Sequence, residues 1–238
     1  MIIDHLCEDK PTLQSCAIVC KEWLPSSRYH LFGELSIKGA NYHHEQFLEF
    51  LQGATHIAPY IRSLLLAGSI DATILLDLLR LLQDLIEVRL FDLGVDGGST
   101  TLDDMIVALL SMKNLTYLYI YGDFPQCSQP STVPYSVAPV GPSNLRSLQT
   151  FMFPKMNMPQ LWRAIAQSKA APRSVPLDVL DVPIDLCDES CDIIVAHEFS
   201  NFLREVGSEI KILTMDFRAV SPDVFFSECN SNIPPNTN

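Results

Sequence analysis

Short runs of alternating apolar and polar residues recur along the chain, and each run follows another apolar residue three positions earlier. The steps between successive runs are 29, 24, 30, 33, 29 and 33 residues. Alternation with a period of two is typical of β-strands. We therefore expect seven strands, at residues 35–37, 64–66, 88–90, 118–120, 151–153, 180–182 and 213–215.

The segments between these runs carry apolar residues at the spacing of a helix that buries one face. We expect helices around residues 74–82, 102–109 and 195–206, and two weaker ones around 47–51 and 161–165. Strands that alternate with helices predict a parallel α/β array, because a parallel pair needs a crossover that a helix can supply. The strands are expected to pair in chain order into one curved sheet, with the helices on its other face.

One connection departs from this alternation. Residues 122–144 contain five prolines and no apolar periodicity, which predicts an extended loop or a disordered insertion in place of a helix. The repeats are expected to occupy residues 34–221, and residues 222–238 are expected to form a disordered or loosely ordered tail.

Residues 1–33 precede the first strand and predict a short helical head. Pro11 suits the first turn of a helix, and Pro25 is expected to end that helix two residues after Trp23. One continuous apolar face is predicted for Leu13, Cys16, Ala17, Cys20 and Trp23. A hairpin of this kind could serve only to cover the open end of the repeat array, as terminal repeats require.

The head also resembles a known motif. Its pattern of Leu13, Cys16, Val19, Cys20 and Trp23, followed by Leu31-Phe32, is similar to the central and C-terminal parts of the F-box of fungal F-box proteins. Strand runs spaced 24–33 residues apart resemble the degenerate leucine-rich repeats that are common in F-box proteins, without the Asn or Cys that closes a standard repeat. The resemblance implies a leucine-rich-repeat-like βα solenoid behind an F-box-like head.

The same resemblance implies a substrate-receptor subunit of an SCF-type (Skp–cullin–F-box) ubiquitin ligase. In that family the repeats select a protein substrate, and the head docks onto the Skp-type adaptor. The adaptor-binding residues carried over are Leu13, Cys16, Val19, Cys20, Trp23, Leu31 and Phe32. An F-box normally begins with a Leu-Pro pair and a first helix upstream of the segment that matches Ile2 to Leu6. Because this sequence starts at Met1, we expect weak adaptor binding or none, through a truncated gene model or a real loss.

Strand alternation also predicts where a partner binds. If the apolar residues of each run point toward the helices, their neighbours point toward the opposite, concave face. Three tyrosines side by side on one strand, next to Arg and Met, are types enriched in interface cores. Their other role would be to shield the sheet, since tyrosine favours strands in any case. The predicted partner-binding residues are Leu65, Arg89, Tyr117, Tyr119, Tyr121, Met152 and Asp181.

Composition narrows the class of partner. The formal net charge is −12, and no segment concentrates Lys and Arg, so nucleic acid and anionic membranes are disfavoured as partners. No stretch is apolar enough for a signal peptide or a membrane span. Seven scattered cysteines without a secretion signal indicate reduced thiols in a cytoplasmic or nuclear protein.

Catalytic and metal-binding motifs are weak. Cys187, Cys191 and His197 lack a fourth zinc ligand, and a pair of core thiols explains the two cysteines better. His43 and His44 are interpreted as an exposed helix start. No nucleophile stands in a recognisable setting, so we expect a protein without enzymatic activity, cofactor or metal. The sequence leaves three hypotheses: a ubiquitin-ligase substrate receptor, a repeat scaffold unconnected with ubiquitin, and, as the minor one, an enzyme with an unrecognised site.

Overall fold

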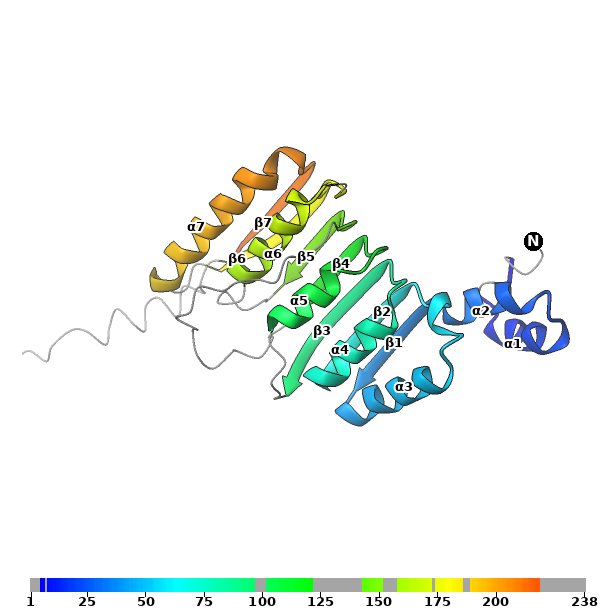
Figure 1. Ribbon diagram of the computed structural model, residues 1–238. Helices are drawn as coiled ribbons and strands as arrows, with labels where there is room; N and C mark the ends of the chain where they lie inside the picture. The colour runs from blue at the N-terminus through cyan, green and yellow to red at the C-terminus, as the bar shows by residue number, and fades with distance from the viewer. Residues whose placement is uncertain are drawn as a thin grey trace, which may run out of the picture.

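The computed structural model describes residues 5–6, 8–96, 102–121, 143–151, 158–172, 174–185 and 189–218 (Figure 1). Two helices come first, α1 (Lys10–Val19) and α2 (Leu24–Phe32). Seven strands then alternate with helices along most of the chain: β1 (Glu34–Gly39), α3 (Asn41–Gly53), β2 (Ser63–Asp71), α4 (Ala72–Leu81), β3 (Glu87–Asp96), α5 (Leu102–Leu110), β4 (Tyr117–Tyr121), β5 (Ser147–Phe151), α6 (Met158–Ala170), β6 (Val179–Asp185), α7 (Glu189–Val206) and β7 (Ile212–Arg218). Short 3-10 turns at Ala58–Tyr60 and Gly207–Glu209 lead toward β2 and β7.

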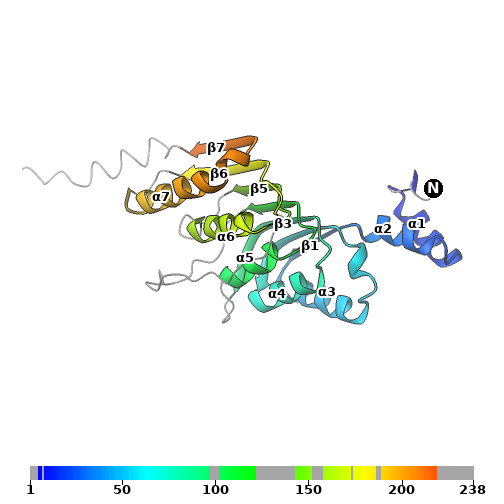
Figure 2. The same ribbon diagram turned by 45° about the horizontal axis from the view of Figure 1, so that its top comes forward.

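The seven strands form one sheet in the order β1-β2-β3-β4-β5-β6-β7, and every neighbouring pair is parallel. This confirms the α/β class and the pairing in chain order. Helices α3 to α7 pack against one another in sequence and lie on one side of the sheet (Figure 2). We call the other side the open face.

The same backbone hydrogen bonds join each repeat to the next. A single carbonyl before each strand accepts from two successive N–H groups at the start of the following strand. Arg62 O accepts from Ile86 N at 2.8 Å and Glu87 N at 3.0 Å, and Thr116 O accepts from Arg146 N at 2.9 Å and Ser147 N at 3.0 Å. This repeated junction keeps the strands in one register, so residues at equivalent positions form rows across the sheet.

The core lies between the sheet and the helices. On β2 the side chains of Leu64 and Leu66 are fully buried, whereas Leu65 between them is half-buried on the open face. Leu78 and Leu79 of α4 are likewise fully buried against this layer. Each such side chain contributes about 1.5–3 kcal/mol through burial alone.

The fifth strand lies three residues earlier than the sequence pattern indicated. We expected Phe151 and Phe153 to point toward the helices, but the strand covers Ser147–Phe151, and its buried residues are Ser147, Leu148 and Thr150. Leu148 pairs with Leu118 of β4, 30 residues earlier. The sequence pattern gave the wrong position for two reasons. This repeat has polar Thr150 where the neighbouring strands have an apolar residue, and Phe151 and Phe153 have the spacing of the strand motif.

The first two strands approach closely at their C-terminal ends. A Cβ on Gly68 would lie 2.2 Å from the carbonyl oxygen of Gly39, and the two glycines have φ angles of 97° and 129°. The register between β2 and β3 shifts at the same place, between Ala67 and Ser69. Glycine is required here both for the positive φ and for the close approach of two backbones.

The head differs from the single long helix that the sequence indicated. Helix α1 ends at Val19, and Cys20 is extended with φ −141° and ψ 127°. Trp23 then occupies the N-cap position of a second helix without a side-chain capping hydrogen bond, and Pro25 lies in the first turn of that helix. Proline therefore begins α2 and does not end α1, because its fixed φ and missing N–H suit a first helical turn.

Some expectations fall on residues outside the described ranges. Most of the proline-rich segment, residues 122–142, and the tail 222–238 belong to these, so both predictions stand as predictions. In the described part of the chain, no helix is long and apolar enough to cross a membrane.

Candidate functional site

The strand register brings four of the predicted binding residues into one row of the open face. Leu65 pairs with Arg89, Arg89 pairs with Tyr119, and Tyr119 pairs with Gln149 of β5. Gln149 in turn pairs with Asp181 of β6. Sequence analysis missed Gln149 because it placed the fifth strand three residues too late. Met152, predicted at this position, lies outside the described residues.

Aromatic rings stand in parallel at the centre of this face. The ring centroids of Phe91 and Tyr121 are 4.4 Å apart with planes 3° apart. Two parallel rings so close can only lie face to face, so both ring normals run across the strands. The Tyr119 ring is tilted 10° from that of Tyr121, at a centroid distance of 6.5 Å along the strand. Because side chains on a strand stand roughly perpendicular to the sheet, the ring edges point outward.

Arg89 is held by two neighbours. Its Nε and Nη2 atoms lie 2.7 Å and 2.6 Å from Oε1 of Glu87, and its guanidinium carbon lies 5.4 Å from the centre of the Tyr119 ring. Oε2 of Glu87 accepts from the Ser63 hydroxyl at 3.0 Å. The hydrogen bond to Glu87 raises the pKa of Arg89 above its ordinary value. The ion pair therefore leaves the centre of the open face without net charge, although 45% of the Arg89 side chain is exposed.

The tyrosines of β4 offer hydroxyl groups. Burial, and then the charge of Glu87, raise the pKa of Tyr119 above its ordinary value, so this phenol stays protonated at neutral pH. The hydroxyl of Tyr121 donates to Oε1 of Gln149 at 3.4 Å. Tyr117, at the start of the strand, is 42% exposed. We use the name aromatic patch for this centre of the open face, made of Arg89, Phe91, Tyr117, Tyr119, Tyr121 and Gln149.

The remaining predicted residues of this face lie at its margins. Leu65 is half-buried on β2, two strands away from Tyr119. Asp181 is half-buried on β6, and its carbonyl accepts from the Thr150 hydroxyl at 3.4 Å. Glu34 and Lys38 of β1 are exposed on the same side of the sheet, at the end next to the head.

The residues carried over for adaptor binding divide by exposure. Leu13 is fully buried inside the head. Half-buried positions are taken by Cys16, Cys20, Leu31 and Phe32. Val19 and Trp23, by contrast, are 75% and 41% exposed.

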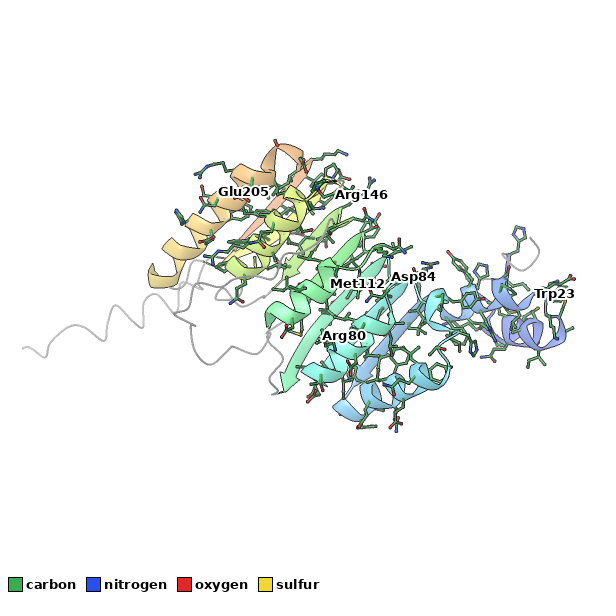
Figure 3. All side chains as sticks on the ribbon, viewed as in Figure 1. Trp23, Arg80, Asp84, Met112, Arg146 and Glu205 are labelled. Atoms are coloured by element: carbon green, nitrogen blue, oxygen red, sulfur yellow. The ribbon has the colours of Figure 1, made fainter. Side chains whose placement is uncertain are left out.

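Ile18, which precedes Val19 at the end of α1 and which the motif did not single out, is 86% exposed. We call Ile18, Val19 and Trp23 the head patch. Figure 3 places Trp23 at the end of the head that is far from the sheet.

On the helical side of the molecule, a cleft of about 230 Å³ lies between α6 and α7. Arg163 and Glu198 form an ion pair at its wall, with Nη2 and Oε1 2.5 Å apart, which lowers the pKa of Glu198. The Trp162 and Phe199 rings pack 4.7 Å apart nearby. These contacts join the last two described helices.

Metal ligands do not converge in the part of the chain that the structure describes, where no group of three or more His, Cys, Asp or Glu side chains could hold an ion. Cys187 and the side chain of Cys191 lie outside that part, so their pairing with His197 stays untested. Comparison with known proteins does not assign the chain to a family: no family model matches it, and no curated protein matches its sequence.

Proposed function

We propose that this protein is the substrate-receptor subunit of an SCF-type ubiquitin ligase. In this proposal the head patch contacts a Skp-type adaptor, and the aromatic patch contacts the protein to be ubiquitinated. The F-box resemblance of the head motivates the proposal, and the exposure of the head patch is the observation that carries it.

An exposed head patch is unexpected if the head only covers the end of the repeats. Ile18 and Val19 lie at the C-terminal end of α1 with 86% and 75% of their surface in solvent, and Trp23 follows directly after the turn. Large apolar residues that cluster on a surface mark interaction sites more often than isolated ones do. Helix α2, and not the head patch, contacts the edge strand β1 of the sheet. The side of the head that carries the patch is therefore free for a second protein.

The aromatic patch supports the second half of the proposal. Tyrosine and arginine are enriched among residues that dominate binding energy, because they combine large apolar area with hydrogen-bonding groups. Here they come from β3 and β4, two central strands whose open face none of the described helices covers. The aromatic patch therefore offers a surface for the substrate on the repeat body, separate from the head.

The adaptor half is tested by measuring binding of a purified Skp-type adaptor to the chain, alone and extended by a Leu-Pro-containing first F-box helix. We expect binding in the extended form and loss of at least ten-fold in affinity on Trp23→Ala or Ile18→Asp. Tyr42→Ala is the matched control, because Tyr42 is 54% exposed on α3, outside the head. No binding by the extended chain, or binding that Trp23→Ala leaves unchanged, would contradict the adaptor role.

The substrate half is tested with a partner captured from native extract and rebound to variants of confirmed fold. We expect Tyr119→Ala and Arg89→Ala to weaken rebinding by about 2 kcal/mol or more each, as for residues at an interface centre. Arg80→Ala is the control for Arg89, because Arg80 is exposed on α4 at the opposite side of the sheet. Undiminished rebinding to both test variants would place recognition elsewhere.

A repeat scaffold without any link to ubiquitin is the second candidate. It is favoured by one observation: the aromatic patch is built entirely from β3, β4 and β5, so it needs nothing from the head. Capture of a partner through Tyr119, together with no adaptor binding by the extended chain, would favour this scaffold over the ligase subunit.

A further inference from the structure

The aromatic patch offers more hydrogen-bond donors than acceptors. Both carboxylate oxygens of Glu87 already accept, one from Arg89 and one from Ser63. Oε1 of Gln149 accepts from Tyr121. The carboxylate and amide acceptors next to the rings are therefore used within the sheet.

The donors of the patch remain available. Within the described ranges, the Nε2 group of Gln149 and the hydroxyls of Tyr117 and Tyr119 have no hydrogen-bond partner in the protein. The guanidinium of Arg89 has five N–H groups, and Glu87 accepts from the one on Nε and from one on Nη2, so three remain for a ligand. The tyrosine hydroxyls can also accept, but the N–H groups of Arg89 and Gln149 can only donate, so a ligand that satisfies them must supply acceptors.

The charge of the protein further restricts the class of ligand that fits this patch. The Arg89–Glu87 ion pair cancels within the patch, and the chain as a whole carries −12, so an anionic acceptor gains nothing from the field. The other charged side chains named on this face are Glu34 and Lys38 at its β1 margin, which are opposite in sign, and Asp181 of β6 beside Gln149, which adds a negative charge. Neutral carbonyl oxygens are the acceptors that fit best.

We propose, resting on the protein-binding role given above, that the aromatic patch binds a proline-rich segment of a partner in the polyproline II conformation. Such a segment presents backbone carbonyls with few N–H groups, because proline has none. Recognition of this conformation by aromatic side chains with hydrogen-bond donors is a recurring mode of peptide binding. Its rigid backbone also loses little conformational entropy on binding.

The spacing of the sheet agrees with this ligand. Three residues of polyproline II advance about 9.3 Å, and two steps between neighbouring strands amount to about 9.6 Å. In a segment that crosses the strands at right angles, equivalent residues of successive turns therefore lie over every second strand. Arg89 on β3 and Gln149 on β5 are two strands apart in one row. Their donors therefore meet carbonyls of successive turns, while the Tyr119 ring between them packs against the proline rings.

The probe is a fluorescein-labelled twelve-residue oligoproline, titrated with the full chain and followed by fluorescence anisotropy. Glycine-serine, acidic and basic peptides of equal length serve as comparison probes. We expect saturable binding of the oligoproline that is tighter than that of the other three. Tyr119→Phe and Gln149→Glu each remove a donor while keeping the shape, and each is expected to weaken binding roughly two- to ten-fold. Tyr29→Phe on α2 and Gln46→Glu on α3, both exposed, are the matched controls and should leave binding unchanged.

The titration is repeated with residues 122–142 replaced by a glycine-serine sequence, because the prolines of the chain itself are potential competitors. Binding of oligoproline to that variant alone, with the same dependence on Tyr119 and Gln149, also supports the proposal. Absence of binding in both forms, tighter binding of an acidic or basic peptide, or insensitivity to both test variants would overturn it.

Failure of this inference is distinguishable from failure of the proposed function. A captured partner whose rebinding falls on Tyr119→Ala, but which excess oligoproline does not displace, refutes the proline-rich ligand and leaves the binding role intact. Rebinding that is insensitive to both Tyr119→Ala and Arg89→Ala refutes the binding role of this face itself.

Discussion

The head and the repeat body use their apolar residues in opposite ways. From β2 to β4 the inward residues of each strand are at most 3% exposed, as with Leu66 and Ile120. Of the residues described in the head, only Leu13 and Ser27 are fully buried, and Ile18 is 86% exposed. A repeat is covered by neighbours on both sides, whereas two short helices enclose little volume. Burial therefore separates residues that hold this fold together from residues that are free to bind.

Within the body the same separation runs between alternate residues of one strand. Leu66 faces the helices with no exposed surface, and Leu65 next to it lies half-buried on the open face. Two leucines of equal size and propensity thus have different tasks. Matched substitutions on the two sides of a strand, or in the body and in the head, measure how much each residue contributes to stability and how much to binding.

The largest effect is expected from the core of the body. Leu66→Ala should lower the free energy of unfolding by about 2–5 kcal/mol, because it leaves a cavity that the packed layer cannot refill. Leu65→Ala is the matched variant and should cost less than about 1.5 kcal/mol, since its side chain is partly solvated already. Urea unfolding followed by circular dichroism gives both values, and equal losses would show that the two faces are not distinct.

The pH dependence of stability due to Lys169 of α6 tests the C-terminal part of the repeat body. Its ammonium group donates to the carbonyl of Leu145 and, at 2.5 Å, to that of Val175, and burial lowers its pKa to about 8. The unfolded chain, with a lysine pKa near 10.5, binds more protons between pH 8 and 10.5, so the free energy of unfolding should rise with pH through this window. We expect a rise of roughly 1–3 kcal/mol after allowance for partial exposure. Urea titrations at several pH values check it, and Lys169→Met, which cannot titrate, should remove this part of the rise.

A variant of His44 tests the first repeat of the body, where α3 packs against β1 and β2. The sequence placed His43 and His44 together at an exposed helix start, and this is wrong for His44: its ring is fully buried on α3, whereas His43 is exposed. Burial lowers the pKa of His44 below 6.5, against the nearby backbone of Ala40 and Ser69, which favours the charged ring. The unfolded chain then binds more protons, so stability should fall as pH drops below 6.5.

Hydrogen exchange of α3 and β1 at pH 7.5 and pH 5 measures this loss locally. His44→Gln should remove the pH dependence, and His43→Gln, on the exposed neighbour, should retain it. Equal protection of α3 at both pH values in the unaltered protein would contradict the role given to His44.

The smallest effect is expected from the head patch. Ile18→Ser changes a side chain that is mostly in solvent, so the free energy of unfolding should change by less than about 0.5 kcal/mol. Thermal unfolding of the purified chain measures it. A loss comparable to that of Leu66→Ala would mean that Ile18 holds the fold and is not available to a partner.

Much of the repeat fold could be predicted from the sequence. Period-two alternation placed every strand except β5, and apolar spacing placed α3 to α7, because both depend on which residues next to each other in sequence can be buried together. The fifth strand was misplaced where one repeat uses Thr150 inward and puts two phenylalanines just beyond. A local pattern could not detect this, since only pairing with β4 shows that Leu148, and not Phe151, continues the buried row.

The candidate binding surfaces were predicted only in part. Arg89, Tyr119 and Asp181 follow from alternation alone, because a strand that buries one set of side chains must present the other. Gln149 depends on the register of β5. The cancellation of the Arg89 charge depends on an ion pair with Glu87 that only the folded strand brings about.

The chain by itself determined the order of strands and helices, because alternation and helical spacing are properties of neighbours in sequence. The tertiary structure alone decided that α1 stops at Val19 and that His44 is buried while Ile18 is exposed. These outcomes depend on how much volume the surrounding elements enclose. That volume is set by residues far apart in the sequence, which no local pattern contains.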